Sequence, residues 1–284
     1  DVYKRQVALI SQPAGPRAGR YGRDMQILNS ILGAVFGAIM LPFRNWPTLG
    51  LILISAVVSV GILLIFKQVS NQERIEGVKR KIHAALFEIR LFNDDLGAIV
   101  RSQLDILRHN LSYLRLQLFP LLFILPPVIL IMAQLQPYYG YSGLEVGEPV
   151  MLRVEVRSPD GGETEFLLDD KPSIELALPT GLELDSAGVW IPSKGEMIWR
   201  LVATEPGDYE LEVQTAGGSF TKSVRATDQT VRRSPMRVSS VSDQFLYPAE
   251  KPLSKSDPIR SITVTYPEDP EVLLMPRWMW IFFI

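Results

Sequence analysis

Two uncharged apolar runs, LGLILISAVVSVGILLIF at residues 49–66 and LFPLLFILPPVILIMAQL at residues 118–135, decide the fold of this chain. A bilayer core about 30 Å thick is crossed by roughly 17–25 helical residues. Only a helix or a closed barrel satisfies the backbone there. Buried helices of a soluble core are the alternative, but the charged residues that flank both runs favour the membrane. We therefore expect an integral membrane protein with transmembrane helices over residues 48–66 and 118–136.

The connection between the two runs, residues 70–117, has the pattern of two amphipathic helices. Ser70-Asn-Gln-Glu73 is a capping box that begins the first helix, and Asn93-Asp-Asp95 interrupts the pattern. The first apolar row is Ile75, Val78, Ile82, Leu86 and Ile89. The matching row of the second helix is Leu96, Ile99, Val100, Leu104, Leu107, Leu111 and Leu114. These two rows predict an antiparallel helical hairpin, similar to a coiled coil.

The distribution of charge predicts the orientation of the chain. Residues 67–115 carry nine Lys/Arg and six Asp/Glu, whereas residues 136–276 carry 13 Lys/Arg and 23 Asp/Glu. Because short loops rich in Lys and Arg stay in the cytoplasm, we expect a cytoplasmic hairpin and an extracytoplasmic acidic segment. The expected location is the inner (cytoplasmic) membrane, with the acidic segment in the periplasm or outside the cell.

The residues before the first run are expected to lie at the outer interface. Residues 25–47 place apolar side chains at helical spacing before Pro42 and Pro47, which predicts an interfacial helix, with a re-entrant helix as the alternative. Residues 1–24 fit nothing that follows, and DVYKRQ resembles a translated transposon end from sequencing-library preparation. We expect these residues to be non-native read-through, or else a disordered basic tail.

From residue 140 to residue 228 the periodicity changes from 3.6 to 2. Four alternating segments lie at residues 150–156, 198–203, 209–213 and 219–226, with glycine-rich turns between them. About seven short strands predict an immunoglobulin-like β-sandwich. Residues 229–275 are rich in Ser, Pro and Asp and are expected to be a linker in which residues 261–266 could add an edge strand. Residues 276–284 are expected to begin a third, truncated transmembrane helix, with a short strand as the alternative.

The membrane half resembles the core of the YidC/Oxa/Alb membrane-protein insertases. The likeness is carried by LISAVVSVGILLIFKQVSNQERIEGVKRKI at residues 52–82 and LRHNLSYLRLQLFPLLFILPPVILI at residues 107–131. It is closest to the small archaeal homologues and to the insertase-like subunit of the ER membrane complex. The resemblance implies a polar groove between membrane helices and a hairpin that meets the ribosome or a nascent membrane protein. Bacterial members carry an arginine inside the first core helix, and here the nearest base is Lys67, at the membrane edge.

Two sets of candidate site residues follow. The groove candidates are the polar residues of the two spans and their ends: Ser55, Ser59, Lys67 and Gln134. Helix packing is the alternative reading of the two serines. The candidates for partner contact on the hairpin are its basic residues: Lys79, Arg80, Lys81, Arg101 and Arg108.

The chain has no cysteine, which excludes disulfides and thiolate chemistry. Because the sequence has no nucleophile motif, phosphate-binding loop or metal-ligand cluster, we expect neither an enzyme nor a cofactor. Nor does any basic patch with interleaved aromatic residues indicate DNA. The expected partners are the lipid bilayer, nascent membrane proteins or the ribosome, and an envelope protein that binds the β-sandwich. The competing hypotheses are an anchored envelope protein whose sandwich binds a protein or glycan, and a transmembrane sensor.

Overall fold

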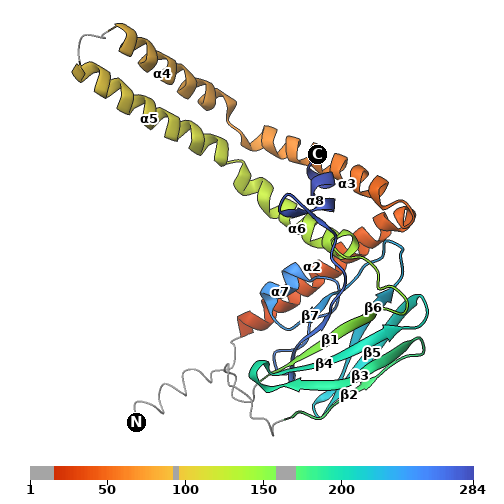
Figure 1. The fold of residues 1–284 in the computed structure, drawn as a ribbon. Coiled ribbons are helices and arrows are strands. Elements are labelled where there is room, and N and C mark those ends of the chain that lie inside the picture. Colours follow the sequence, from red (N-terminus) through yellow and green to blue (C-terminus); the bar gives the residue numbers. More distant parts are fainter. Residues whose placement is uncertain (1–15, 92–95, 158–170) are drawn as a thin grey trace, which may run out of the picture. The chain divides into compact units, whose positions relative to one another are not determined.

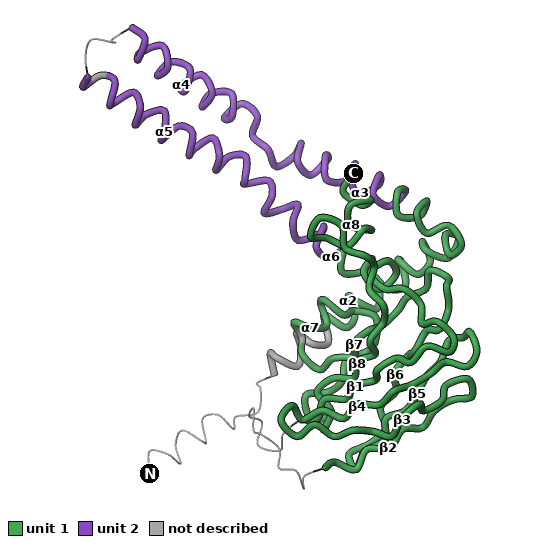
Figure 2. Tube along the Cα trace, in the orientation of Figure 1, with its two compact units in different colours: residues 1–52, 132–284 green, residues 53–131 purple. Residues whose placement is uncertain are grey.

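The computed structural model describes residues 16–91, 96–157 and 171–284, which form helices and antiparallel β-sheets (Figure 1). This mixture confirms the coarse fold class. The chain divides into two compact units, a helical unit of residues 53–131 and a β unit of residues 1–52 and 132–284 (Figure 2). Residues 1–15, and the turn expected at residues 93–95, lie outside the described residues.

The helical unit is built from α3 (Pro47–Val69), α4 (Gln72–Leu91), α5 (Leu96–Leu118) and α6 (Leu121–Tyr139), of which α3 and α6 also extend into the β unit. The side chain of Asn71 caps α4, because its Oδ1 accepts a hydrogen bond of 3.0 Å from the backbone N–H of Arg74. The cap is therefore one residue later than the expected Ser70. Near its start α6 passes through Pro126 and Pro127 without a break.

The helices α4 and α5 lie side by side (Figure 1), but their contact surface differs from the expected one. On α4 most of the expected row is buried or half-buried, as Ile75 and Ile82 are, but Leu86 is exposed and Ala85 is buried in its place. On α5 the buried or half-buried residues follow a different row at heptad spacing, which shares only Ile99 with the expected one: Ile99, Ser102, Ile106, His109, Tyr113 and Leu116. The expected leucine row of α5 is exposed. The row that packs against α4 contains polar residues such as Ser102, and for this reason the hydrophobic pattern alone did not predict it.

Three helical segments are long and apolar enough to cross a membrane, judged by length and composition: Asp24–Phe43, Pro47–Val69 and Ile99–Tyr139. The first includes most of α2 (Pro16–Met40) and the 3-10 turn η1 (Leu41–Phe43). It overlaps the segment expected to lie along the interface. The expected third membrane helix corresponds to α8 (Arg277–Phe283), whose Trp278 and Phe282 are buried.

The β unit holds two main antiparallel sheets around one hydrophobic core (Figure 1). The first has the strand order β3-β4-β1-β8-β7 and the second has the order β2-β5-β6. The strands are β1 (Pro149–Val156), β2 (Ile174–Ala177), β3 (Leu182–Ile191), β4 (Glu196–Ala203), β5 (Gly207–Thr215), β6 (Gly218–Ala226), β7 (Met236–Val238) and β8 (Ile259–Val264). The turn η2 (Pro192–Lys194) joins β3 to β4, and β9 (Glu271–Val272) pairs with β10 (Met275–Pro276).

Strand alternation explains the core. Leu152 and Val154 of β1 and Leu211 and Val213 of β5 are fully buried, while their neighbours in sequence face outward. The two inner faces therefore meet in a shared core, as in sheet-on-sheet packing.

The expectation of a linker at residues 229–275 is wrong. This segment contributes β7, α7 (Val241–Leu246) and β8. Because β8 pairs with both β1 and β7, it is an interior strand and not an edge strand, and its Ile262 and Val264 are fully buried. Ser and Thr at the outward positions of β8 gave the segment the composition of a linker.

Candidate functional site

A polar cluster in the β unit joins two of the apolar segments to the β-sheet segment. Nη2 of Arg232 donates a hydrogen bond of 3.3 Å to Oε1 of Gln134 in α6, and Nε2 of Gln134 donates one of 3.4 Å to Oδ1 of Asn29 in α2. The side chain of Gln134 is buried, at 2% exposure. Asn29 also donates to the carbonyl oxygen of Gln244 at 3.0 Å. These hydrogen bonds fix the side chains of Asn29, Gln134 and Arg232, although Nε of Arg232 is buried without a hydrogen-bond partner.

The guanidinium of Arg232 lies directly against α2. A Cβ atom added at Gly33 would overlap the Arg232 guanidinium, so the glycine creates the space that the cation occupies. Arg232 also donates a hydrogen bond of 2.7 Å to the carbonyl oxygen of Pro248. A positive charge is thus held between α2 and α6, both of which belong to segments apolar enough to cross a bilayer.

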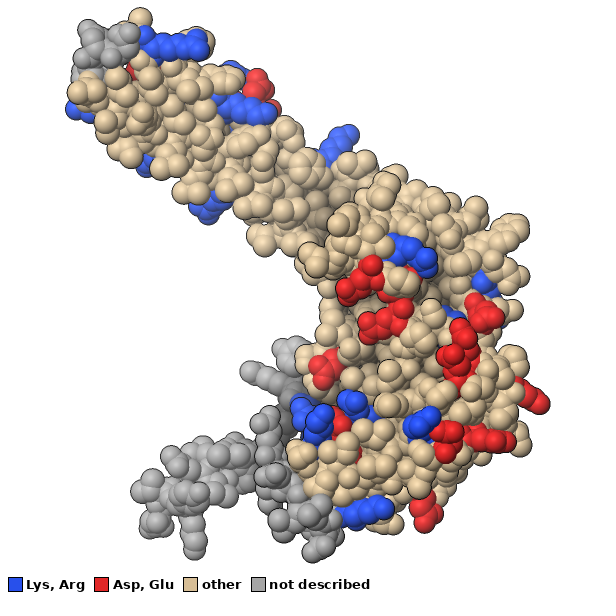
Figure 3. Space-filling view, in the orientation of Figure 1, with Lys and Arg blue, Asp and Glu red and all other residues tan. Residues whose placement is uncertain are grey.

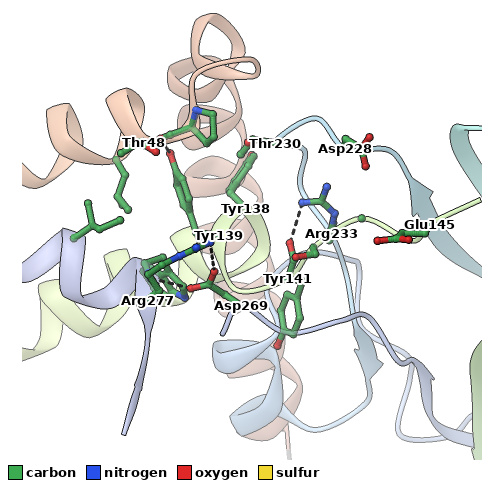
Figure 4. Close-up of a pocket in the computed structure, with 16 residues that line it drawn as sticks. Thr48, Tyr138, Tyr139, Tyr141, Glu145, Asp228, Thr230, Arg233, Asp269 and Arg277 are labelled. Carbon is green, nitrogen blue, oxygen red and sulfur yellow. Dashed lines mark hydrogen bonds and ion pairs between the residues drawn. The ribbon is translucent and has the colours of Figure 1, made fainter. Parts of the chain in front are cut away.

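A cavity of about 610 Å³ lies in the β unit, beside the end of α6 (Figure 4). Its wall is rich in aromatic side chains, because Tyr138, Tyr139, Tyr141 and Trp278 all line it. The rings of Tyr139 and Trp278 are stacked, with centroids 6.3 Å apart. The hydroxyl of Tyr139 donates to the carbonyl oxygen of Pro47 at 2.9 Å, which fixes the ring in place.

Charged groups of both signs surround this cavity. Asp269 pairs with Arg277 at 3.1 Å and accepts a hydrogen bond of 2.9 Å from the backbone N–H of Trp278. Glu145 and Asp228 line the opposite part of the wall in Figure 4. Aromatic faces with a few fixed polar groups are typical of ligand-binding cavities.

Arg233 makes the base of the cavity rigid. It is buried, and its guanidinium donates to the carbonyl oxygens of Tyr141, Thr227 and Gln229 at 3.0, 2.8 and 2.8 Å. Burial raises the pKa of Tyr141 to about 12, so its phenol remains protonated at neutral pH. The cavity therefore offers aromatic surface, and the phenol of Tyr141 is not a group that ionises readily.

A second polar cluster lies within the sheets. Nζ of Lys222 is fully buried and contacts Oε2 of Glu250 at 2.8 Å, the carbonyl oxygen of Ser234 at 2.5 Å and Oγ of Ser234 at 3.1 Å. The carboxylate of Glu250 also accepts hydrogen bonds from the backbone N–H and hydroxyl of Ser223. All three protons of the ammonium thus have acceptors.

The protonation of this pair reflects burial and charge together. Burial lowers the pKa of Lys222, while the charge of Glu250 opposes that effect. Burial alone would raise the pKa of Glu250, but the charge of Lys222 and the hydrogen bonds from Lys222 and Ser223 hold it below its usual value. A serine beside a lysine suggests a nucleophile and base, but Ser234 is buried and the ammonium is held by a carboxylate. The cluster is therefore a structural ion pair.

The structure divides the predicted groove residues between the two units. Ser55 is buried on α3, and Ser59 and Lys67 are exposed, all in the helical unit. Gln134 lies in the β unit and belongs to the polar cluster with Arg232.

The predicted hairpin residues are all exposed: Lys79, Arg80, Lys81, Arg101 and Arg108. Nζ of Lys79 lies 5.6 Å from the ring centroid of Tyr113, and Arg80 pairs with Glu76 at 3.0 Å. Figure 3 shows Lys and Arg scattered along the hairpin, separated by uncharged surface. The basic residues are thus available for contact but do not form one continuous patch on that face.

Sequence reasoning missed Asn29, Arg232 and the Lys222–Glu250 pair. Lys222 had a signal, because it occupies an inward position of β6 between Phe220 and Val224. An inward lysine in an alternating strand requires a buried partner. Arg232 had no such signal, since its contacts on α2 and α6 are 199 and 98 residues away.

No protein-family model matches this chain, and no curated protein or solved structure matches it either.

Proposed function

We propose that this protein is a membrane-protein biogenesis factor, with insertase-like or chaperone-like activity, in the cytoplasmic membrane. The observation that carries the proposal is the guanidinium of Arg232, held against Gly33 of α2 and 3.3 Å from Gln134 of α6. Polar and charged groups among apolar membrane helices are costly and usually functional. In this proposal the hairpin is cytoplasmic and the β unit, an immunoglobulin-like sandwich, is extracytoplasmic.

In the proposed activity, the protein lowers the free-energy cost of removing a polar client segment from water. A polar segment that enters a bilayer loses its hydrogen bonds to water, and a groove lined by polar side chains replaces some of them. Arginine suits this role because its five donors remain protonated and can bind carbonyl or carboxylate oxygens. The resemblance to YidC/Oxa/Alb proteins implies an arginine in the first core helix, and here Arg232 would supply the cation from the β unit instead.

The test is site-specific photocrosslinking in membranes that translate a short membrane protein. The full chain carries the photoreactive group at Ser59, which is exposed. We expect a crosslink to the ribosome-tethered nascent chain that disappears when the client's apolar segment is deleted. Insertion of the client, scored by protease protection, should fall in Arg232→Gln and be partly retained in Arg232→Lys, which keeps the charge. Crosslinks that join Ser59 only to the protein's own helices would contradict the proposal.

The cavity of Figure 4 favours a second candidate function, an anchored envelope protein whose β unit binds a protein or glycan. Stacked aromatic rings near carboxylates, such as Tyr139 and Trp278 beside Asp269, suit sugar faces and hydroxyl groups. Saturation-transfer NMR with neutral oligosaccharides tests this candidate. Asp228→Asn, on the cavity wall, should reduce the signal, and Asp185→Asn, on the outer face of β3, should not. An unchanged signal in both variants would exclude the cavity as the glycan site.

A further inference from the structure

The hairpin formed by β9 and β10 ends in two leucines that have an unfavourable backbone conformation. Val272 pairs with Met275, so Leu273 and Leu274 form the two-residue loop between the strands. Their φ angles are 47° and 71°, and they are the two non-glycine residues of the described chain with a positive φ. A two-residue loop of this kind favours Asn-Gly, Asp-Gly or Gly-Gly, because the Cβ atom of a leucine is crowded at positive φ. The turn itself therefore gives no reason for either leucine.

The two side chains do not pack against the protein either. Leu273 is 80% exposed and Leu274 is 95% exposed. Residues 272–276, with the sequence Val-Leu-Leu-Met-Pro, carry no formal charge, whereas Glu271 and Arg277 flank them. The hairpin thus has an apolar end, the leucine tip (Leu273 and Leu274), and a charged base. Backbone strain of this kind persists where a function requires it, and no packing within the described chain accounts for this tip.

Contacts with the end of α6 hold the base of this hairpin. The backbone N–H of Asp269 donates a hydrogen bond of 3.0 Å to the carbonyl oxygen of Gly140, the residue after α6. The ring of Trp278 stacks on the ring of Tyr139, the last residue of α6, with centroids 6.3 Å apart. Because α6 belongs to a segment that is apolar enough to cross a membrane, the hairpin starts at the end of such a segment.

Aromatic side chains surround the hairpin. Nε1 of Trp280 in α8 donates a hydrogen bond of 2.5 Å to the carbonyl oxygen of Val272 in β9, which joins the hairpin to α8. Tyr and Trp concentrate at the level of the lipid headgroups, and Tyr139, Trp278 and Trp280 all lie at or beside the hairpin. The charged base and these rings therefore suit the headgroup region, and the leucine tip suits the acyl chains below it.

A protein partner matches the leucine tip less well than lipid does. A specific protein interface covers about 800 Å² on each partner and involves about 20–30 residues. The tip consists of two side chains, and the charged residues Glu271 and Arg277 limit it on both sides. A second copy of this chain meets the same limit. Acyl chains adapt to a small apolar surface, and each leucine gains free energy by leaving water.

We propose that the leucine tip inserts into the acyl chains of the bilayer and anchors the β unit to the membrane surface. Burial of Leu273 and Leu274 in lipid compensates for their unfavourable φ angles, which explains why a turn suited to Asn-Gly carries two leucines. Insertion of the tip rests on the membrane location in the proposed function. It does not depend on insertase-like activity, because an anchored binding protein could use the same tip.

The test measures the depth of a spin label on the full chain in nanodiscs of phosphatidylcholine. The label is attached at Val272→Cys, beside the tip, where the native side chain is 45% exposed. Its collision rates with oxygen, which dissolves in lipid, and with a water-soluble nickel chelate give its depth. We expect oxygen collisions to dominate, with the label about 5–10 Å below the lipid phosphates. Ile129→Cys in α6 is the immersed reference and Glu210→Cys in β5 is the aqueous reference.

Leu273→Asn with Leu274→Gly is the matched variant. Asn-Gly suits two positive φ angles, so this change keeps the turn and removes its apolar surface. We expect the label at Val272→Cys to move into water, so that nickel collisions dominate, while the thermal midpoint in detergent stays at least as high. Leu184→Asn, which removes an exposed leucine from β3, should leave the label at its depth. A label that is equally deep in the Asn-Gly variant would overturn the proposal.

The reference positions separate insertion of the tip from the membrane location of the protein. An aqueous label at Val272→Cys together with an immersed label at Ile129→Cys would exclude insertion and leave the proposed membrane location intact. Aqueous labels at both positions would exclude insertion and the membrane location together. A label at Val272→Cys that neither reagent reaches would mean that protein covers the tip, which also contradicts the proposal.

Discussion

The ammonium of Lys222 lies 2.8 Å from a carboxylate oxygen of Glu250, with no solvent exposure of the lysine side chain. This contact joins β6 to the segment after α7, which the composition of the chain suggested was a linker. Breaking a buried ion pair leaves an uncompensated charge, whereas the pair itself contributes little net energy. Losing either partner alone should therefore weaken the attachment of the segment around Glu250 to β6.

Removing one partner should be more harmful than removing both. We expect Lys222→Met to lower the free energy of unfolding of the β unit by about 3–5 kcal/mol. Lys222→Met combined with Glu250→Leu should cost less than the single change, because no buried charge remains. Arg200→Ala, which breaks the exposed pair with Asp185, is the control and should cost at most about 1 kcal/mol. Denaturant unfolding followed by tryptophan fluorescence measures all three.

Acid should destabilise the β unit through Glu250. The pKa of its carboxyl is held below the ordinary value in the folded state. Its contribution to stability is therefore fully present above the unfolded value of about 4.3 and is lost as the pH falls through the lowered folded value. We expect the free energy of unfolding to decrease from about pH 5 towards pH 2. Glu250→Gln should flatten that slope, and an identical slope in the variant would assign the acid sensitivity to other carboxylates.

Gly33 and Gly37 of α2 provide a matched pair of helix positions. A Cβ atom at Gly37 would meet Oη of Tyr138 at 3.6 Å, an ordinary contact, whereas one at Gly33 would overlap Arg232. Gly33→Ala should therefore be less stable than Gly37→Ala by about 1–2 kcal/mol, although both gain helix propensity. In an Arg232→Ala background this difference should disappear. Thermal unfolding in one detergent measures it.

The register of the hairpin can be tested by two truncations. Ile75 is buried between α4 and α5, whereas Leu107 is exposed. We expect Ile75→Ala to destabilise the hairpin by about 2–4 kcal/mol and Leu107→Ala to change its stability by no more than about 0.5 kcal/mol. Amide hydrogen exchange across residues 72–118 reports both. A larger cost at Leu107 would mean that the leucine row faces α4 after all.

The orientation in the membrane is testable because the chain has no cysteine. Ser112→Cys lies on the hairpin and Glu210→Cys on β5, and both positions are exposed. In intact cells an impermeant maleimide should label Glu210→Cys and should not label Ser112→Cys, because the basic hairpin is expected in the cytoplasm. Membrane disruption should make both reactive. The reverse labelling would exclude the proposed topology.

Several elements followed from local pattern. The apolar runs predicted α3 and α6, the heptad spacing predicted α4 and α5, and alternation predicted β1, β4, β5 and β6. These features depend on neighbours in sequence. In a helix every third or fourth side chain lies on one face, and in a strand every second side chain does. Membrane helices of that length are likewise recognisable from composition.

The sequence by itself therefore determined the kind of those elements that have a regular pattern, and the division of the chain into apolar helices, a basic hairpin and an acidic β region. Only the tertiary structure decided which face of α5 meets α4, that β8 is an interior strand, and that Arg232 lies against Gly33. These facts depend on residues that are distant in sequence, and a polar side chain such as Ser102 or Lys222 has no local sign of the partner that will cover it. Burial depends on the whole assembled fold, so the polar clusters around Arg232 and Lys222 could be identified only from the tertiary structure.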